Sequence, residues 1–110
     1  MTIKEIPKTE RPREKLMTRQ GSSLATSELL AILLSSGNKE KNVLEMAFEL
    51  LNQVGKISNL EYITIEELKQ IKGIGEAKAS KILAAIELGR RIFLEKEDKI
   101  KLDTPEKIFE

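Results

Sequence analysis

A short glycine-rich segment, Gly73-Ile74-Gly75, carries the strongest chemical signal in this sequence of 110 residues. Glycine at both outer positions permits backbone angles that side chains forbid, and it lets a ligand approach the main chain closely. A helical pattern begins directly after Gly75, and the first N–H groups of a helix have no partners within that helix. Because these donors and the positive end of the helix dipole favour an anion, the segment predicts a phosphate site.

Basic side chains stand on both sides of this predicted site. Lys72 precedes the turn, and Lys78 and Lys81 follow it, so all three are candidates for charge-assisted contacts to the phosphate. Arg90 and Arg91 lie further along the same predicted helix and are candidates for additional basic contacts. The alternative is a plain pair of helices whose lysines are solvated. For any single lysine, both interpretations stay open.

The residues from Leu68 to Ile82 follow the order hxxhxGhGxxxAxxh, in which h is apolar. In this order Ile74 points inward and holds the turn on the core, and Ala79 is small enough for two helices to cross closely. The order resembles the helix-hairpin-helix motif of DNA-binding proteins. The resemblance implies that the amides of residues 73–75 hold one backbone phosphate. Such a contact positions a protein on DNA without reading its base sequence.

The composition excludes several classes of catalytic site. Cysteine and histidine are both absent, which rules out a thiol nucleophile, a Ser-His-Asp triad and a Cys/His zinc site within this chain. No catalytic residue, metal ligand or cofactor is therefore predicted, and the chain is not expected to be an enzyme. No apolar run approaches the roughly 20 residues of a membrane helix, and the N-terminus lacks a signal-peptide core. We expect a cytoplasmic protein with no membrane partner.

Charge is segregated along the chain although the net charge is only +1. Residues 1–20 carry six basic and three acidic side chains, and residues 68–94 carry six and two. The acidic excess lies in residues 21–67, with three basic and seven acidic side chains, and in 95–110, with four and six. Two basic segments that share one face would bind a polyanion despite the neutral total. Ordinary alternation of sign on the surface is the alternative.

The sequence predicts an all-α domain of about five to six helices. It is rich in Leu and Ile, has only two Val, and contains no segment with strand alternation. Asn42 with Glu45 and Thr64 with Glu67 form capping-box signals. The expected helices cover residues 12–20, 27–35 after a cap at Thr26 or Ser27, 42–54, 57–62, the segment before Gly73, and 76–96. Residues 1–11 are expected to form a flexible arm, 12–96 the domain, and 97–110 a linker.

The helices at 27–35 and 42–54 are candidates for a first, degenerate hairpin, joined to the second by the short helix at 57–62. This arrangement would make the domain a pseudo-duplicated double hairpin. The first loop, Ser36-Gly37-Asn38-Lys39, lacks the glycine–apolar–glycine core, so it predicts weaker phosphate contact or a structural role. A generic helix pair that packs on the second hairpin is an equal alternative.

Six blocks in order resemble the N-terminal region of the bacterial RadC-like DNA repair protein family, over roughly residues 7–94. They are Pro12–Leu16, Leu24–Leu34, Gly37, Val43–Ala47, Ile71–Ala79 and Glu87–Arg91. Family members share a C-terminal domain of the JAB/MPN metalloprotease-like type with a zinc site. The resemblance thus implies a chain without that domain, and it implies zinc only for the absent part. Ser35-Ser36 replaces a common Arg-Thr pair, which removes one basic contact. Arg13 and Lys15 extend the basic surface, or Arg13 pairs with an acid of the middle segment.

These features leave three candidate functions. The first is a sequence-independent DNA-binding module, with DNA as the partner. The alternative is a protein-interaction or regulatory module that docks the absent C-terminal domain, a second copy or another protein. A DNA glycosylase fits less well, because the chain is short for a two-domain enzyme. No catalytic Asp or Lys is placed in the usual region just after the hairpin helix, because Asp98 and Asp103 fall in a polar tail where they are expected to be solvated.

Overall fold

The computed structural model describes residues 10–34 and 42–103, with side chains up to Lys99. Within these ranges every regular element is a helix and no strand occurs, which confirms the all-α prediction. The elements are α1 (Pro12–Thr18), η3 (Gly21–Ser23), α2 (Thr26–Leu34), α3 (Val43–Val54), η4 (Ile57–Tyr62), α4 (Ile65–Lys69) and α5 (Glu76–Asp103), where η is a 3-10 helix. Most of the predicted arm and the predicted loop at residues 36–39 lie outside the described residues.

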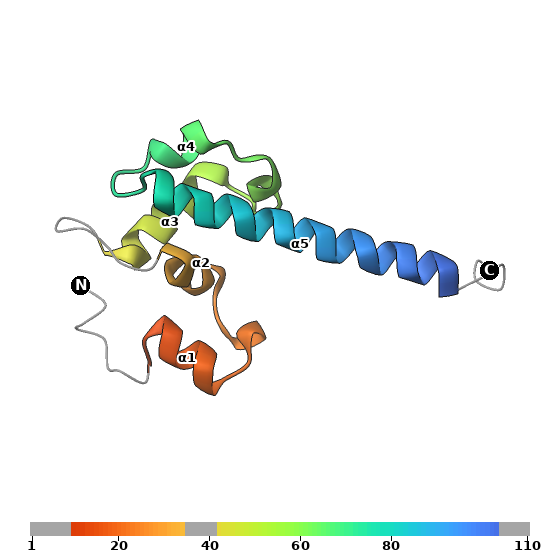
Figure 1. Cartoon of the computed structure of the whole chain (residues 1–110). Helices are drawn as coiled ribbons and strands as arrows, with labels where there is room; N and C mark the ends of the chain where they lie inside the picture. Colours follow the sequence, from red (N-terminus) through yellow and green to blue (C-terminus); the bar gives the residue numbers. More distant parts are fainter. Residues whose placement is uncertain (1–9, 35–41, 104–110) are drawn as a thin grey trace.

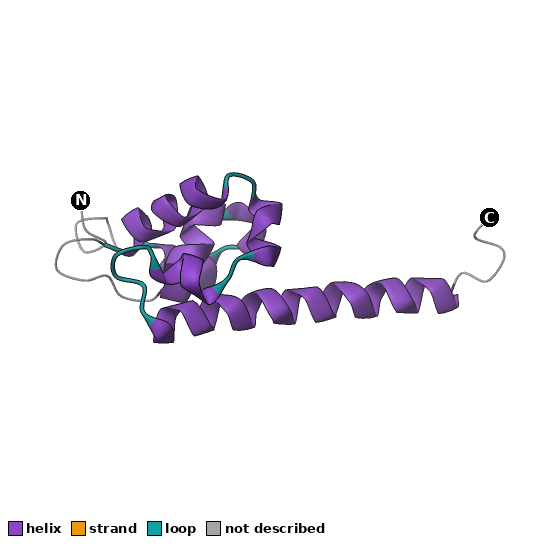
Figure 2. Cartoon of the chain, turned by 90° about the horizontal axis from the view of Figure 1, so that it is seen from above, coloured by secondary structure: helices purple, strands orange, loops and turns teal. Residues whose placement is uncertain are grey.

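Helix α5 is the longest element and sets the shape of the molecule. The other helices gather around its N-terminal half (Figure 1). Seen from above, its C-terminal half extends alone from the body of the domain (Figure 2). Among the described residues, no helix is both long and apolar enough to span a bilayer.

The core lies where α2, α3, α4 and the first turns of α5 meet. Helix α2 packs against α3 and α5, and α4 packs against α5. The largest fully buried side chains are Leu34, Met46, Leu50, Leu68, Ile71 and Ile82. All but Met46 were expected on an apolar face, whereas Phe48, which was expected among the apolar positions of α3, is 54% exposed. Removal of apolar surface from water stabilises the fold by about 25 cal/mol per Å².

Both predicted capping boxes are confirmed. The Asn42 side chain accepts a hydrogen bond from the Glu45 N–H at 2.8 Å, and the Glu45 carboxylate accepts one from the Asn42 N–H at 3.1 Å. At α4, Thr64 and Glu67 exchange the same two bonds at 3.1 and 2.9 Å. The linking helix predicted at 57–62 is present as the 3-10 helix η4.

The predicted cap of α2 is wrong, because α2 begins at Thr26 itself. The Glu28 carboxylate accepts a hydrogen bond from the Ala25 N–H at 2.8 Å instead. The same carboxylate pairs with Lys15 of α1 at 2.5 Å, and this hydrogen bond lowers the pKa of Glu28. The pairing with an acid of the middle segment that was expected of Arg13 is therefore made by Lys15, while Arg13 is exposed.

Helix α5 continues seven residues past its predicted end at Lys96, to Asp103. No glycine or proline interrupts this stretch, and the Glu95–Lys99 pair has the i,i+4 order that supports a helix. The predicted boundary between residues 96 and 97 thus falls inside a helix. Ile92 and Phe93, grouped with the apolar positions of this helix, are 58% and 62% exposed because they lie beyond the body of the domain.

Candidate nucleic-acid interface

The connection between α4 and α5 is a tight turn anchored in the core. Gly73 has a φ of 97°, in the left-handed region that favours glycine, as predicted. Gly75 has no positive φ, so the expectation that its backbone angles require glycine is wrong. Ile74 is 3% exposed and fixes the turn on the core, as predicted, and Ala79 is fully buried.

Gly75 occupies the N-cap position of α5, because its carbonyl accepts the Ala79 N–H at 2.9 Å. It has no side chain to cap the helix. Within the described part of the chain, no group accepts a hydrogen bond from the N–H groups of residues 76–78. A Cβ added at Gly75 would meet no atom within 4 Å. The start of α5 is therefore an open set of donors that a ligand can approach.

An acidic side chain also borders this turn. Glu76 is the first residue of α5, and its carboxylate lies 3.6 Å from the Lys69 ammonium at the end of α4. The Glu76 side chain is 79% exposed, and an acid at this position interacts favourably with the helix dipole. The prediction of basic contacts did not include the negative charge of Glu76. The preference for acidic residues in the first turn of a helix could have indicated its position.

The structure brings the hairpin lysines to the start of α5. Lys78 lies in its first turn and Lys81 in its second, within about 9 Å of Gly75 along the axis. Lys72 lies in the turn itself, and both Lys72 and Lys81 are exposed. These two lysines already have partners within the protein, whereas Lys78 is partly buried.

Arg90 and Arg91 lie further along α5, about 22 Å from Gly75 along the helix axis. Both bind Glu87: Arg90 donates to its two carboxylate oxygens at 3.1 and 2.8 Å, and Arg91 donates at 2.9 Å. These bonds, from Arg90 first and then Arg91, lower the pKa of Glu87 to about 2, and Glu87 raises the pKa of Arg90. The Glu87 carboxylate offsets one of the two positive charges.

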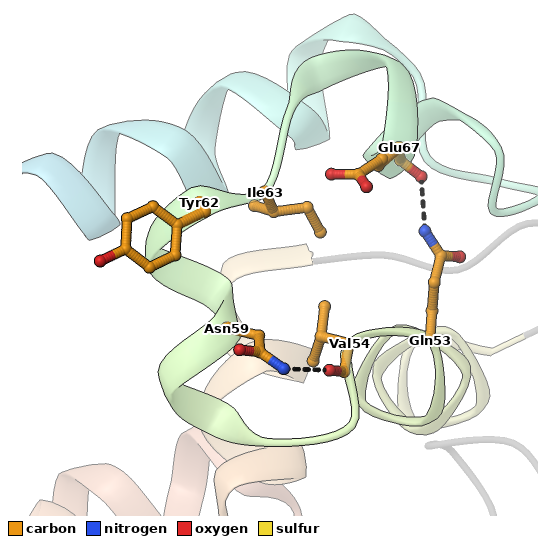
Figure 3. Close-up of a pocket in the computed structure, with 6 residues that line it drawn as sticks. All are labelled: Gln53, Val54, Asn59, Tyr62, Ile63 and Glu67. Atoms are coloured by element: carbon orange, nitrogen blue, oxygen red, sulfur yellow. Dashed lines mark hydrogen bonds between the residues drawn. The ribbon is translucent and has the colours of Figure 1, made fainter.

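A recess between α3, η4 and α4 was not foreseen from the sequence (Figure 3). Its lining residues are Gln53, Val54, Asn59, Tyr62, Ile63 and Glu67. The Gln53 amide donates to the Glu67 carbonyl at 3.1 Å, and the Asn59 amide donates to the Val54 carbonyl at 2.7 Å. These polar groups join neighbouring elements, so they form structural bonds.

No group of three His, Cys, Asp or Glu residues in ranges 10–34 and 42–103 is placed to hold a metal ion. The expectations of no metal, no cofactor and no catalysis remain predictions.

Comparison with protein families adds the decisive observation. Residues 3–80 match the model of the UPF0758 N-terminal domain. The chain belongs to the UPF0758 family. This result confirms the resemblance to the N-terminal domain of RadC-like proteins, since UPF0758 and RadC name the same family. The matched residues include the whole α4–α5 turn and end one turn into α5.

Curated bacterial UPF0758 proteins align over most of the chain. The protein of Alkaliphilus oremlandii is 50% identical over 95 residues, which are 86% of this chain and 41% of the relative. That of Geobacillus sp. (strain WCH70) is 54% identical over 82% of this chain and 40% of the relative. That of Carboxydothermus hydrogenoformans is 44% identical over 97% and 48%. The chain thus spans less than half the length of these relatives. No solved structure matches the chain.

Proposed function

We propose that this UPF0758 domain binds the phosphate backbone of DNA through the α4–α5 turn, without reading bases. The observation that carries the proposal is the open N-terminus of α5. The N–H groups of residues 76–78 have no acceptor among the described residues, and the N-cap residue, Gly75, has no side chain to supply one. Helix N-termini of this kind favour phosphate.

The surrounding charges support a phosphodiester as the ligand. Lys72, Lys78 and Lys81 lie around the start of α5, where ammonium groups add charge-assisted contacts to a phosphate. The turn offers backbone donors and lysines, and neither group distinguishes one base from another. Contacts of this kind position the domain on DNA, and sequence preference is not expected.

Fluorescence anisotropy with a labelled duplex and a matching single strand tests the proposal. The chain is titrated at low and moderate salt beside the double variant Lys78→Glu/Lys81→Glu. Binding by two or three phosphate contacts predicts a slope of log affinity on log salt of about −2 to −3. The double variant should lose this salt-sensitive binding, and the two titrations rank the two forms of DNA.

The double variant Lys56→Glu/Lys96→Glu is the matched control. It introduces the same change of charge at two exposed lysines outside the turn. We expect it to retain most of the affinity. Equal losses in both double variants would show a general charge effect and contradict a site at the turn. Absence of binding by the unchanged protein at low salt would reject the proposed function.

A protein-interaction module is the second candidate function. The observation that favours it is the group of large apolar side chains along one side of α5 that remain exposed, Leu88, Ile92 and Phe93. Contiguous exposed apolar surface is typical of a binding site for another protein. This role is compatible with DNA binding at the opposite end of α5.

A further inference from the structure

The lysines of α5 between residues 76 and 99 all lie on one face of the helix. They form two pairs, Lys78 with Lys81 and Lys96 with Lys99. The second pair repeats the first after 18 residues, from 78 to 96 and from 81 to 99, which is five turns of an α-helix. All four lysines therefore lie within about 30° of one direction around the helix axis, and the two pairs are about 27 Å apart along it.

The centre of this face is apolar and exposed. Leu88 and Ile92 lie between the two lysine pairs, within about 50° of the same direction, and they are 62% and 58% exposed. Ala85 and Gly89 lie beside them, and a Cβ added at Gly89 would meet no atom within 4 Å. We name this surface the lysine face. It consists of Lys78, Lys81, Leu88, Ile92, Lys96 and Lys99.

The lysine face is separate from the core and from most acidic side chains of α5. The buried Ala79 and Ile82 mark the side toward the core, about 100° away around the axis. Glu95 lies at the edge of the lysine face, about 70° from its centre. The other acids lie about 130° or more from that centre, at positions 76, 87, 97 and 98. The lysine face is therefore basic at both ends and apolar in the middle.

We propose that the lysine face binds an acidic amphipathic helix of another protein. Such a helix would place carboxylates at two positions about 27 Å apart, opposite the two lysine pairs. Its apolar side chains would lie between them, opposite Leu88 and Ile92, as in other complexes in which an amphipathic helix is recognised through its apolar face. The small residues Ala85 and Gly89 permit a close approach of the two helix axes.

Charge complementarity selects this occupant over a second copy of the chain. Because the lysine pairs stand at both ends of the face, two copies packed face to face would place lysines opposite lysines in either orientation. Like charges across an interface are unfavourable. A nucleic acid would supply phosphates to the lysines, but it would also place its charged backbone against Leu88 and Ile92. A partner that is acidic at both ends and apolar in the middle satisfies every part of the face.

A designed peptide tests the proposal. The probe is a fluorescently labelled, alanine-based helix with two Glu pairs 18 residues apart, matching the lysine pairs, and Leu between them on the same face. The reference peptide has Lys in place of each Glu. In anisotropy titrations with the whole chain at low salt, we expect the Glu peptide to bind at least about tenfold more tightly than the reference. Added salt should reduce the difference, because it screens the ion pairs.

Two variants locate the binding on α5 without altering the α4–α5 turn, so the result does not depend on DNA binding. Lys96→Glu/Lys99→Glu reverses the charge of the outer pair, and Ile92→Glu places a carboxylate in the apolar centre. Each should weaken binding of the Glu peptide by about fivefold or more, since each replaces a favourable contact by a repulsive or desolvated one. Leu94→Glu is the matched control, because Leu94 is 44% exposed and lies about 170° away around the helix. It should bind the peptide like the unchanged chain.

Circular dichroism of each variant verifies that α5 still forms. Equal affinity for the two peptides, or no binding of the Glu peptide, would overturn the proposal. Equal losses in Ile92→Glu and Leu94→Glu would also overturn it. Vesicles of phosphatidylcholine and phosphatidylserine form a separate arm of the experiment. Binding to these vesicles without binding to the Glu peptide would assign the lysine face to an anionic membrane surface and reject a protein partner.

Discussion

The helix pairs α2–α3 and α4–α5 differ in how the second helix of each pair is capped at its N-terminus. The N-cap of α3 is Asn42, whose side chain accepts a hydrogen bond from the Glu45 N–H. The N-cap of α5 is Gly75, which has no side chain and leaves the first N–H groups without an acceptor in the described chain. A capping box also closes the short helix α4.

This difference separates a structural helix end from a candidate binding site. The unpaired N–H groups of a helix must find partners in side chains, water or a ligand. Where the chain supplies its own acceptor, a phosphate has to displace it. Where glycine stands instead, a phosphate competes only with water. The comparison supports phosphate binding at α5 and a structural role for the start of α3.

The sharpest way to break the comparison is to give α5 a cap of its own. In Gly75→Asp, the new carboxylate accepts hydrogen bonds from the open N–H groups and repels phosphate. We expect a loss of DNA affinity of at least about tenfold, or roughly 1.4 kcal/mol. The free energy of unfolding should stay the same or rise by a few tenths of a kcal/mol, since Asp is a better N-cap than Gly.

The reciprocal variant Asn42→Gly is the control. It opens the start of α3 and should lower the free energy of unfolding by a few tenths of a kcal/mol. DNA affinity, measured by anisotropy at low salt, should not change. If Asn42→Gly altered affinity as much as Gly75→Asp, the two helix starts would be equivalent and the assignment to α5 would fail.

The two glycines of the turn allow a second test, because only one has a left-handed backbone. Gly73→Ala forces a side chain into a φ of 97°, so we expect a loss of about 1 kcal/mol in the free energy of unfolding. Gly75→Ala has open space for its Cβ and a permitted φ, so its loss should be about 0.5 kcal/mol or less. Urea denaturation measures both, and equal losses would contradict the assigned difference.

Features encoded by residues near each other in sequence were predicted well. The two capping boxes need only residues three positions apart, and Ile74 between two glycines is enough to indicate a buried turn. The apolar spacing of α3 and the start of α5 likewise indicates most of the core side chains, although it omits the buried Met46 and includes the exposed Phe48. In each of these places, local preference and tertiary packing favour the same structure.

The failures arise where a distant contact or the end of the domain decides the outcome. Glu28 caps α2 from within the helix while it pairs with Lys15, thirteen residues away, and the local signal at Thr26 and Ser27 could not reveal this. Helical spacing shows that Ile92 and Phe93 are apolar positions. It does not show that the core ends before them. DNA binding stays a prediction, because a phosphate site also depends on a ligand that neither sequence nor fold contains.

The smallest expected effect is a pH dependence of stability that arises from Glu87. This residue belongs to the α4–α5 pair. The second pair carries Arg90 and Arg91 on α5, and Glu87 binds both, so its pKa is about 2 in the folded protein against 4.5 for an ordinary glutamate. Between pH 2 and pH 4.5, Glu87 is protonated in the unfolded chain and ionised in the folded chain. This contribution to stability is therefore complete above about pH 4.5 and is lost as the pH falls through 2.

An NMR titration of the Glu87 carboxyl carbon measures this directly. We expect a midpoint near 2 in the unchanged chain and a shift back toward 4.5 in Arg90→Gln, since Arg90 lowers the pKa more than Arg91 does. Arg91→Gln should shift the midpoint by less. Because the pair is exposed to solvent, added salt should weaken both effects. A midpoint near 4.5 in the unchanged chain would mean that Glu87 leaves both arginines available to a polyanion along α5.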